Sequence, residues 1–165
     1  MNAVQNTLMQ VAKKHMQERL KANVSSNDAA AVWIEQLRGL MSSIKEWVEP
    51  LQDLEGFTIE ETECRYRTTD SSGRNGELKG TSLRLWFSDT SILISPQWFQ
   101  VNDDSLSAGV VKVMGNGMVG PYDIVYVNGS FDTVSRNNNN LRFGDLMFTQ
   151  ILADEVPTLK PSTER

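Results

Sequence analysis

The sequence feature that most constrains the fold is a run of large apolar residues at the spacing of a packed helix. Six of them follow one another at intervals of four, three, four, three and four positions: Trp33, Leu37, Leu40, Ile44, Trp47 and Leu51. This spacing places the side chains on one stripe of an α-helix, and such a stripe needs a second apolar surface to cover it. We expect the chain's own β-sheet to provide that surface, with a second subunit as the alternative.

Two amphipathic helices are predicted in the first 50 residues. Apolar residues recur every three or four positions between Ala3 and Lys21, which predicts a first helix. The polar segment Asn23–Asp28 contains several side chains that can cap a new helix, so we place a turn there. The second helix then runs to Glu49, because Pro50 lacks a backbone donor and disfavours helical geometry in the residue before it. The prediction is a helical hairpin over residues 1–50.

After residue 56 the sequence changes to short runs of β-branched and aromatic residues separated by turn-forming residues. The predicted strands are Phe57–Arg67, Ser82–Phe87, Ser91–Ser95, Trp98–Val101, Gly109–Met114 and Ile124–Val127. Short turns such as Asn128-Gly129 favour an antiparallel arrangement. We therefore expect an antiparallel sheet of five or six strands within residues 57–135.

The remaining C-terminal part is predicted to contain one short helix. The asparagine tract at residues 137–140 is expected to be a loop or a strand connection. A helix is predicted over residues 144–156, because Pro157 ends it, and residues 158–165 are expected to be a disordered tail. The whole prediction is a single α+β domain over residues 1–157, with the helical hairpin packed on the sheet.

Composition limits the classes of partner and the cellular location. The chain has 165 residues, 21 of them acidic and 16 basic, with a formal net charge of −5. Nucleic acid is therefore not expected as a partner, because binding to phosphates needs basic patches. The single cysteine, Cys64, allows no internal disulfide, and the N-terminus lacks the pattern of a signal peptide. No apolar stretch approaches the roughly 20 residues that cross a bilayer. We expect a cytoplasmic protein with no membrane partner.

The sequence contains one known sequence motif and few candidate catalytic or metal-binding residues. Residues 115–120 fit G-x-G-x-x-G, but Pro121 and a predicted strand follow where a dinucleotide site needs a helix, so we interpret the motif as a glycine-rich strand connection. The only histidine, His15, is far in sequence from Cys64, and nothing else has the spacing of a metal site. We expect no catalytic residue, no metal and no cofactor.

Two pairs of adjacent aromatic residues indicate exposed aromatic surface. Neighbouring residues of a strand point to opposite faces, so one member of Trp86-Phe87 and one of Trp98-Phe99 must point away from the core. The outward members could pack under the helices, line a ligand cleft or bind another protein. All three interpretations stay open at this point.

The function that these patterns favour is a non-catalytic cytosolic protein-binding module of the inhibitor, immunity, chaperone or adaptor type. We expect it to act through an acidic and aromatic surface, whose candidate residues are Glu35, Glu46, Glu49, Trp86, Trp98 and Phe99. A homodimer through Leu40 and Ile44 of the second helix is a further hypothesis. The alternative function is a small-molecule or nucleotide-handling enzyme with a carboxylate site in the concavity of the sheet, whose candidate residues are Asp123, Asp132, Tyr126 and Arg84.

Overall fold

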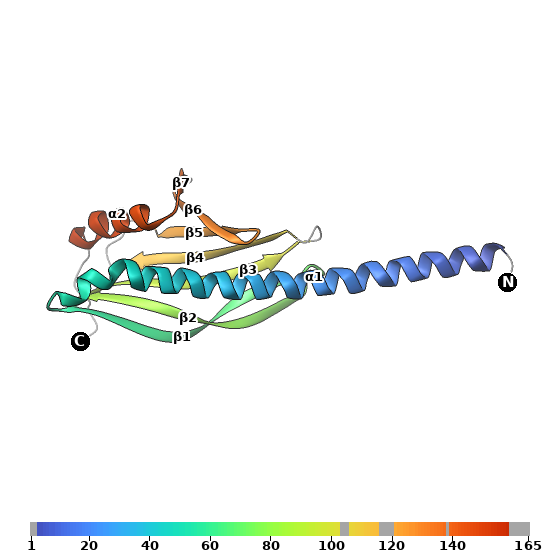
Figure 1. The fold of residues 1–165 in the computed structure, drawn as a ribbon, viewed down its shortest axis with the longest axis horizontal. Helices are drawn as coiled ribbons and strands as arrows, with labels where there is room; N and C mark the ends of the chain where they lie inside the picture. The colour runs from blue at the N-terminus through green and yellow to red at the C-terminus, as the bar shows by residue number, and fades with distance from the viewer. Residues whose placement is uncertain (1–2, 103–105, 116–120, 138, 159–165) are drawn as a thin grey trace.

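One continuous N-terminal helix, α1 (Ala3–Val48), runs across a β-sheet and extends well beyond it in the computed structural model (Figure 1). The structure describes residues 3–102, 106–115, 121–137 and 139–158, and within α1 it describes no side chains for residues 3–6 and 15–27. The predicted tail therefore lies outside the described residues, apart from Thr158. Among the described residues, no helix is both long and apolar enough to cross a membrane.

The predicted helical hairpin is wrong, because α1 continues through Asn23–Asp28 without a turn. Asparagine, serine and aspartate favour helix caps, but in the interior of a helix each lowers helix stability by at most about 0.7 kcal/mol relative to alanine. The segment contains neither glycine nor proline, the two residues that stop a helix most effectively. Around Pro50 the helix does end as predicted, and the short 3-10 helix η1 (Glu49–Asp53) follows.

A seven-stranded meander forms the sheet, so the prediction of five or six strands is wrong. Its strands lie in chain order and each pairs antiparallel with the next: β1 (Phe57–Thr69), β2 (Asn75–Phe87), β3 (Thr90–Val101), β4 (Ser107–Gly115), β5 (Tyr122–Val127), β6 (Ser130–Arg136) and β7 (Asn139–Arg142). Two predicted strands are parts of β3, in which the register shifts between Pro96 and Trp98 without ending the strand. The sequence prediction missed β6 and β7 because both are largely polar.

The G-x-G-x-x-G segment connects two antiparallel strands. Val113 of β4 pairs with Tyr122 of β5, so a strand follows the motif where a dinucleotide site would need a helix. Residues 116–120 themselves lie outside the described residues. At the next connection, Asn128 and Gly129 have φ angles of 45° and 104°, which is the left-handed conformation that an Asn-Gly hairpin turn requires.

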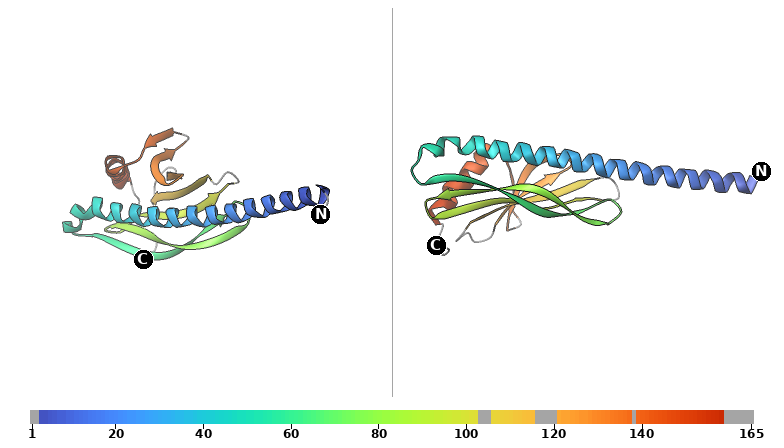
Figure 2. Two further views of the ribbon diagram at one scale, coloured as in Figure 1. Left: turned by 45° about the vertical axis from the view of Figure 1, so that its right-hand side comes forward. Right: turned by 90° about the horizontal axis from the view of Figure 1, so that it is seen from below.

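The hairpin of β1 and β2 is so strongly twisted that β3 has a different neighbour at each end (Figure 2). Near its start β3 pairs antiparallel with β2, where Leu85 lies opposite Ile92. Near its end it pairs in parallel with β1, where Arg67 lies opposite Trp98. Phe57 at the base of β1 and Tyr66 near its tip are nine residues apart, so in a flat strand their side chains would point to opposite faces of the sheet. Both side chains are nevertheless buried in the core. The twist thus turns both faces of β1 inward in succession.

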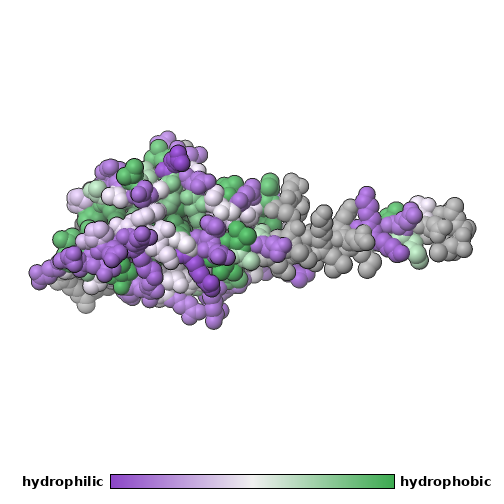
Figure 3. Space-filling model, in the orientation of Figure 1, coloured by the Kyte–Doolittle hydropathy of each residue, from purple (hydrophilic) through white to green (hydrophobic). Residues whose placement is uncertain are grey.

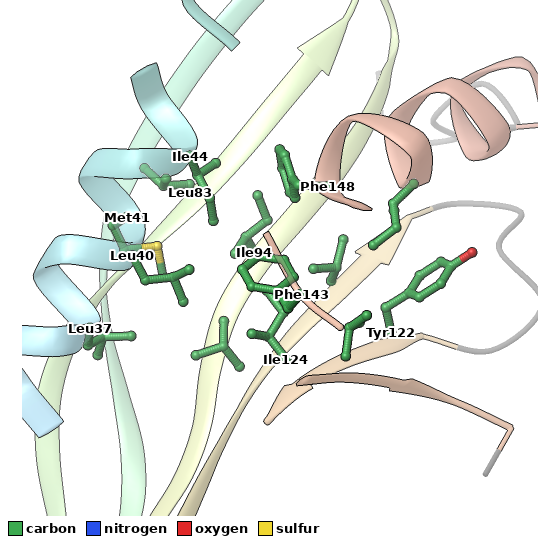
Figure 4. Close-up of a cluster of buried hydrophobic side chains, with 14 of the residues drawn as sticks. Leu37, Leu40, Met41, Ile44, Leu83, Ile94, Tyr122, Ile124, Phe143 and Phe148 are labelled. Carbon is green, nitrogen blue, oxygen red and sulfur yellow. The ribbon is translucent and has the colours of Figure 1, made fainter. Parts of the chain in front are cut away.

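One face of the sheet is covered by α1 and by the C-terminal helix α2 (Asp145–Glu155), which ends in the 3-10 helix η2 (Val156–Thr158). Figure 4 shows side chains of α1, of the central strands and of α2 pointing toward one another in this layer. Most of the predicted stripe is buried there: Trp33, Leu37, Leu40 and Ile44. The expectation that this stripe packs on the chain's own sheet is therefore confirmed, and α2 closely matches the predicted C-terminal helix.

Trp33 is the centre of the part of the core that lies under the hairpin tip. Its side chain is fully buried, and its Nε1–H donates a hydrogen bond to the hydroxyl of Tyr66 at 2.7 Å. The indole ring stacks on Phe99, with ring centroids 5.0 Å apart. Gly109 of β4 lies against the same ring, since a Cβ atom there would come within 2.6 Å of Trp33 Cζ3. This close packing fixes where α1 crosses the sheet.

Candidate binding surfaces

Three of the predicted site residues form an acidic face on the outside of α1 and η1. Glu35, Glu46 and Glu49 are all exposed. At about 100° per residue, Glu35 and Glu46 lie about 20° apart around the helix axis, and Glu35 lies about 160° away from Trp33 on the sheet side. We call these three residues the acidic face. Figure 3 shows the side of the molecule that carries α1, where hydrophilic side chains gather along the helix.

The aromatic residues predicted for the same site lie elsewhere. Trp98 is 36% exposed on the outer face of the sheet, the face that neither α1 nor α2 covers, next to Arg67 of β1. Trp86 lies on the outer face too, and its Nε1–H donates to Glu60 Oε2 at 2.9 Å. Phe99 is only 3% exposed and belongs to the core. The structure therefore does not bring the acidic and aromatic residues together into one surface.

The residues of the alternative, enzymatic hypothesis also do not converge. Tyr126 is fully buried beneath Trp33, and burial raises the pKa of its phenol. Asp123 alternates with the inward-facing residues of β5 and so points to the outer face, whereas Asp132 is exposed on β6 and accepts a hydrogen bond from Ser130 Oγ at 2.7 Å. Arg84 of β2 donates to Ser91 Oγ at 3.0 Å. No common position exists from which all four could act on one substrate.

A groove of about 410 Å³ lies between α1 and the β1–β2 hairpin. Its floor is apolar, with Leu37 and Met41 of α1 among the lining residues. Five charged residues line it as well: Lys45 pairs with Glu61, Lys79 Nζ lies 3.5 Å from Glu63 Oε1, and Arg38 comes from α1. The groove therefore combines an apolar floor with charged residues, four of which form two ion pairs.

A buried polar cluster ties α2 to the sheet. Arg136 Nη1 donates hydrogen bonds to Tyr122 Oη at 2.5 Å and to Glu155 Oε1 at 2.7 Å. The Tyr122 hydroxyl donates to the same Glu155 oxygen at 3.2 Å. Burial raises the pKa of Tyr122, and the neighbouring Glu155 adds to the rise while Arg136 opposes it. The three side chains bond to one another across α2, β5 and β6, so we interpret the cluster as a structural connection.

The N-terminal part of α1, residues 3–27, projects beyond the sheet, and we call it the arm. Among the side chains of α1 that the structure describes, the first that packs against the core is Ala29. The blue part of the helix extends past the end of the sheet in all three ribbon views (Figures 1 and 2). With a rise of about 1.5 Å per residue, the arm is about 37 Å long.

Within the arm, residues 7–14 have fully separated apolar and polar halves. All eight side chains are exposed. The apolar ones, Val11, Leu8, Ala12 and Met9, follow one another around an arc of about 160° at about 100° per residue, and the four polar ones fill the rest. Leu8 is 65% exposed and Val11 61%. The same separation is visible in the sequence. Because this segment was predicted to be one helix of an internal hairpin, its apolar half was expected to be buried and not exposed.

Among the described residues, no three histidine, cysteine, aspartate or glutamate side chains come together as metal ligands. Comparisons with protein-family models, with curated proteins and with solved structures found no match to this chain. The functional interpretation therefore depends on the surfaces described above.

Proposed function

We propose that this chain is a non-catalytic, cytosolic protein-binding module whose docking element is the arm. The observation that carries the proposal is the exposed apolar half of residues 7–14, with Leu8 and Val11 more than half exposed. Helices in water gain most of their stability by packing an amphipathic face against another surface. The chain's own sheet does not reach these described side chains, so a partner is the natural source of that surface.

The acidic face supports the same proposal. Glu35 and Glu46 project from the part of α1 that packs on the sheet, and Glu49 begins η1 directly after it. A negative surface in a fixed position speeds association with a basic partner. The cytosolic part of the proposal is supported by the free thiol of Cys64, which a reducing compartment preserves. A dimer through Leu40 and Ile44 is not part of the proposal, because both residues are buried in the protomer's own core.

The test is affinity capture with the tagged full-length chain from lysate of its native source. The variant Leu8→Glu/Val11→Glu adds two charges to the apolar half of the arm, and Thr7→Glu/Gln10→Glu adds the same two charges to its polar half. We expect a stoichiometric protein that the wild type and the polar-half variant retain and that the apolar-half variant loses. Equal retention by all three proteins would show that the arm is not the docking element.

A further inference from the structure

A concave site lies on the outer face of the sheet, the face that neither α1 nor α2 covers. It has a volume of about 640 Å³ and lies where β3 pairs with β1 instead of β2. We call it the basic hollow, because its charged lining residues are all cations: Arg65 and Arg67 of β1 and Lys112 of β4. Its volume falls within the range of about 300–1,000 Å³ that is typical of small-molecule sites.

The alternation of side chains along the strands places these cations and a tryptophan on one surface. Arg65 and Arg67 flank the buried Tyr66, so both point to the outer face of the sheet. Trp98 lies beside Arg67 where β1 and β3 pair in parallel, and it is 36% exposed. Lys112 alternates with buried residues of β4 and therefore points to the same face.

The cations of the basic hollow are not neutralised by acidic residues within it. Among the described residues, Arg67 and Lys112 form no ion pair, although Asp123 of β5 lies opposite Lys112 in the sheet. Arg65 Nη1 lies 3.4 Å from Glu77 Oε1, but both side chains are more than half exposed, and such a pair contributes little. In the described part of the chain, no acidic residue lines the hollow. The hollow therefore attracts an anion, although the whole chain is acidic.

The remaining lining groups indicate what kind of anion fits. Arginine binds phosphate groups through two parallel hydrogen bonds. The exposed indole of Trp98 provides a flat surface on which a planar ring can stack, as nucleic-acid bases do on aromatic side chains. The amide groups of Asn75, Gln97 and Gln100 can both donate to and accept from the polar edge of such a ring or a sugar hydroxyl. Nucleotides are the class of ligand that combines a phosphate with a planar polar ring.

We propose that the basic hollow binds a nucleotide, with its phosphate held by Arg65, Arg67 and Lys112 and its base stacked on Trp98. A free nucleotide fits better than a nucleic-acid strand, because binding along a phosphate backbone needs an extended basic surface and this chain has a net charge of −5. None of the described lining residues belongs to the arm. The inference therefore does not depend on the proposed function.

The first test is isothermal titration calorimetry of the full-length protein with the 5′-mono- and triphosphates of adenosine, guanosine, cytidine and uridine. We expect at least one of them to bind at one site per chain. The matching nucleoside, which lacks the phosphate, and inorganic tripolyphosphate, which lacks the base, should each bind about tenfold more weakly or worse. If none of the nucleotides binds at millimolar concentration, the inference is overturned. Tripolyphosphate that binds as tightly as the nucleotide would equally exclude a role for the base and for Trp98.

Substitutions test whether binding takes place in the hollow. Arg67→Ala and Lys112→Ala should each weaken binding about tenfold, because each removes a charge-assisted hydrogen bond. Arg142→Ala removes one charge from the exposed strand β7, at the other end of the strand order, and should bind like the wild type. Trp98→Ala should also weaken binding about tenfold, and Trp98→Phe should retain most of the affinity because an aromatic surface remains.

A thermal melt without nucleotide checks that each variant is folded. If Trp98→Ala does not fold, the comparison of Arg67→Ala with Arg142→Ala decides, since both arginines are exposed. Nucleotide affinity that is unchanged in Arg67→Ala and Lys112→Ala would place the binding elsewhere and overturn the inference.

Two further ligands separate a free nucleotide from other anions. A single-stranded octanucleotide that binds much more tightly than the free nucleotide would assign the hollow to nucleic acid. A glutamate-rich peptide that binds when no nucleotide does would assign it to an acidic segment of a partner protein. Either result would overturn the proposed ligand, and weak binding of both would support it.

Discussion

Two identical substitutions, Gly109→Ala and Gly39→Ala, should change stability in opposite directions. At Gly109 the new methyl group would lie 2.6 Å from Trp33 Cζ3 and 3.0 Å from the backbone oxygen of Trp98. Trp33 cannot move away, because its hydrogen bond to Tyr66 and its stacking on Phe99 hold it from two sides. At Gly39, on the exposed side of α1, no atom lies within 4 Å of the added methyl group.

The magnitudes follow from these two environments. Overpacking a rigid core costs about 1–3 kcal/mol, and the lower backbone entropy of the unfolded alanine chain offsets about 0.5–1 kcal/mol of it. We therefore expect Gly109→Ala to lower the free energy of unfolding by about 1 kcal/mol. Alanine in place of an exposed glycine in a helix raises it by about 0.5–1 kcal/mol, so Gly39→Ala should be more stable than the wild type.

The assay is urea unfolding, followed by circular dichroism and tryptophan fluorescence at one protein concentration. With a slope near 2 kcal/mol/M, the midpoint for Gly109→Ala should fall by about 0.5 M. Trp33→Phe should cost less in the Gly109→Ala protein than in the wild type, because the smaller ring makes room for the methyl group. If Gly109→Ala unfolds at the wild-type midpoint, Trp33 is not packed against β4 as the structure describes, and the reasoning fails.

Two further predictions concern buried polar groups. Arg136→Ala should lower the free energy of unfolding by about 2–3 kcal/mol, since it leaves the buried Glu155 without its cation; a thermal melt measures the loss, and an unchanged melting temperature would contradict it. Burial raises the pKa of Tyr66, Tyr122 and Tyr126 above the ordinary value of 10.0. The native state therefore keeps protons that the unfolded chain releases, so this contribution to stability is complete below pH 10 and is lost as the pH rises through the native pKa values. Tyrosinate absorbance should appear together with the loss of circular dichroism, and ionisation near pH 10 in a folded protein would exclude this coupling.

The apolar spacing in the first 50 residues correctly predicted which side of α1 is buried. The local capping preferences of the polar residues incorrectly predicted where the helix ends. The stripe through Trp33, Leu37 and Ile44 predicted the packed side of α1 correctly, because burial of large side chains outweighs any local competitor. The polar run Asn23–Asp28 predicted a turn that does not form. Capping residues allow a helix to begin at that point, but they do not force an existing helix to end.

Strand prediction failed where a strand contributes little to the core. In β6 only Val134 is buried, and every residue of β7 is exposed, so neither strand has the alternation of apolar and polar residues that identifies a strand. The Asn128-Gly129 turn was the available signal, since such a turn implies a second strand after it. For the candidate site, alternation correctly predicted that one residue of Trp98-Phe99 is buried. It could not predict that the acidic face and Trp98 would lie on opposite sides of the sheet, because that depends on the tertiary fold.

Because β3 pairs with β2 near its start and with β1 near its end, the parts of this sheet must form in a particular order during folding. The β1–β2 hairpin is local and can form on the microsecond scale. Its tip, however, pairs with β3 through Arg67 and Trp98, which are 31 positions apart, and this pairing needs both the full twist of the hairpin and a β3 already in place. The tip of β1 therefore docks late. The hydrogen bond from Trp33 to Tyr66 can form only then, which makes the fluorescence of a core tryptophan a reporter of the final closure of the fold.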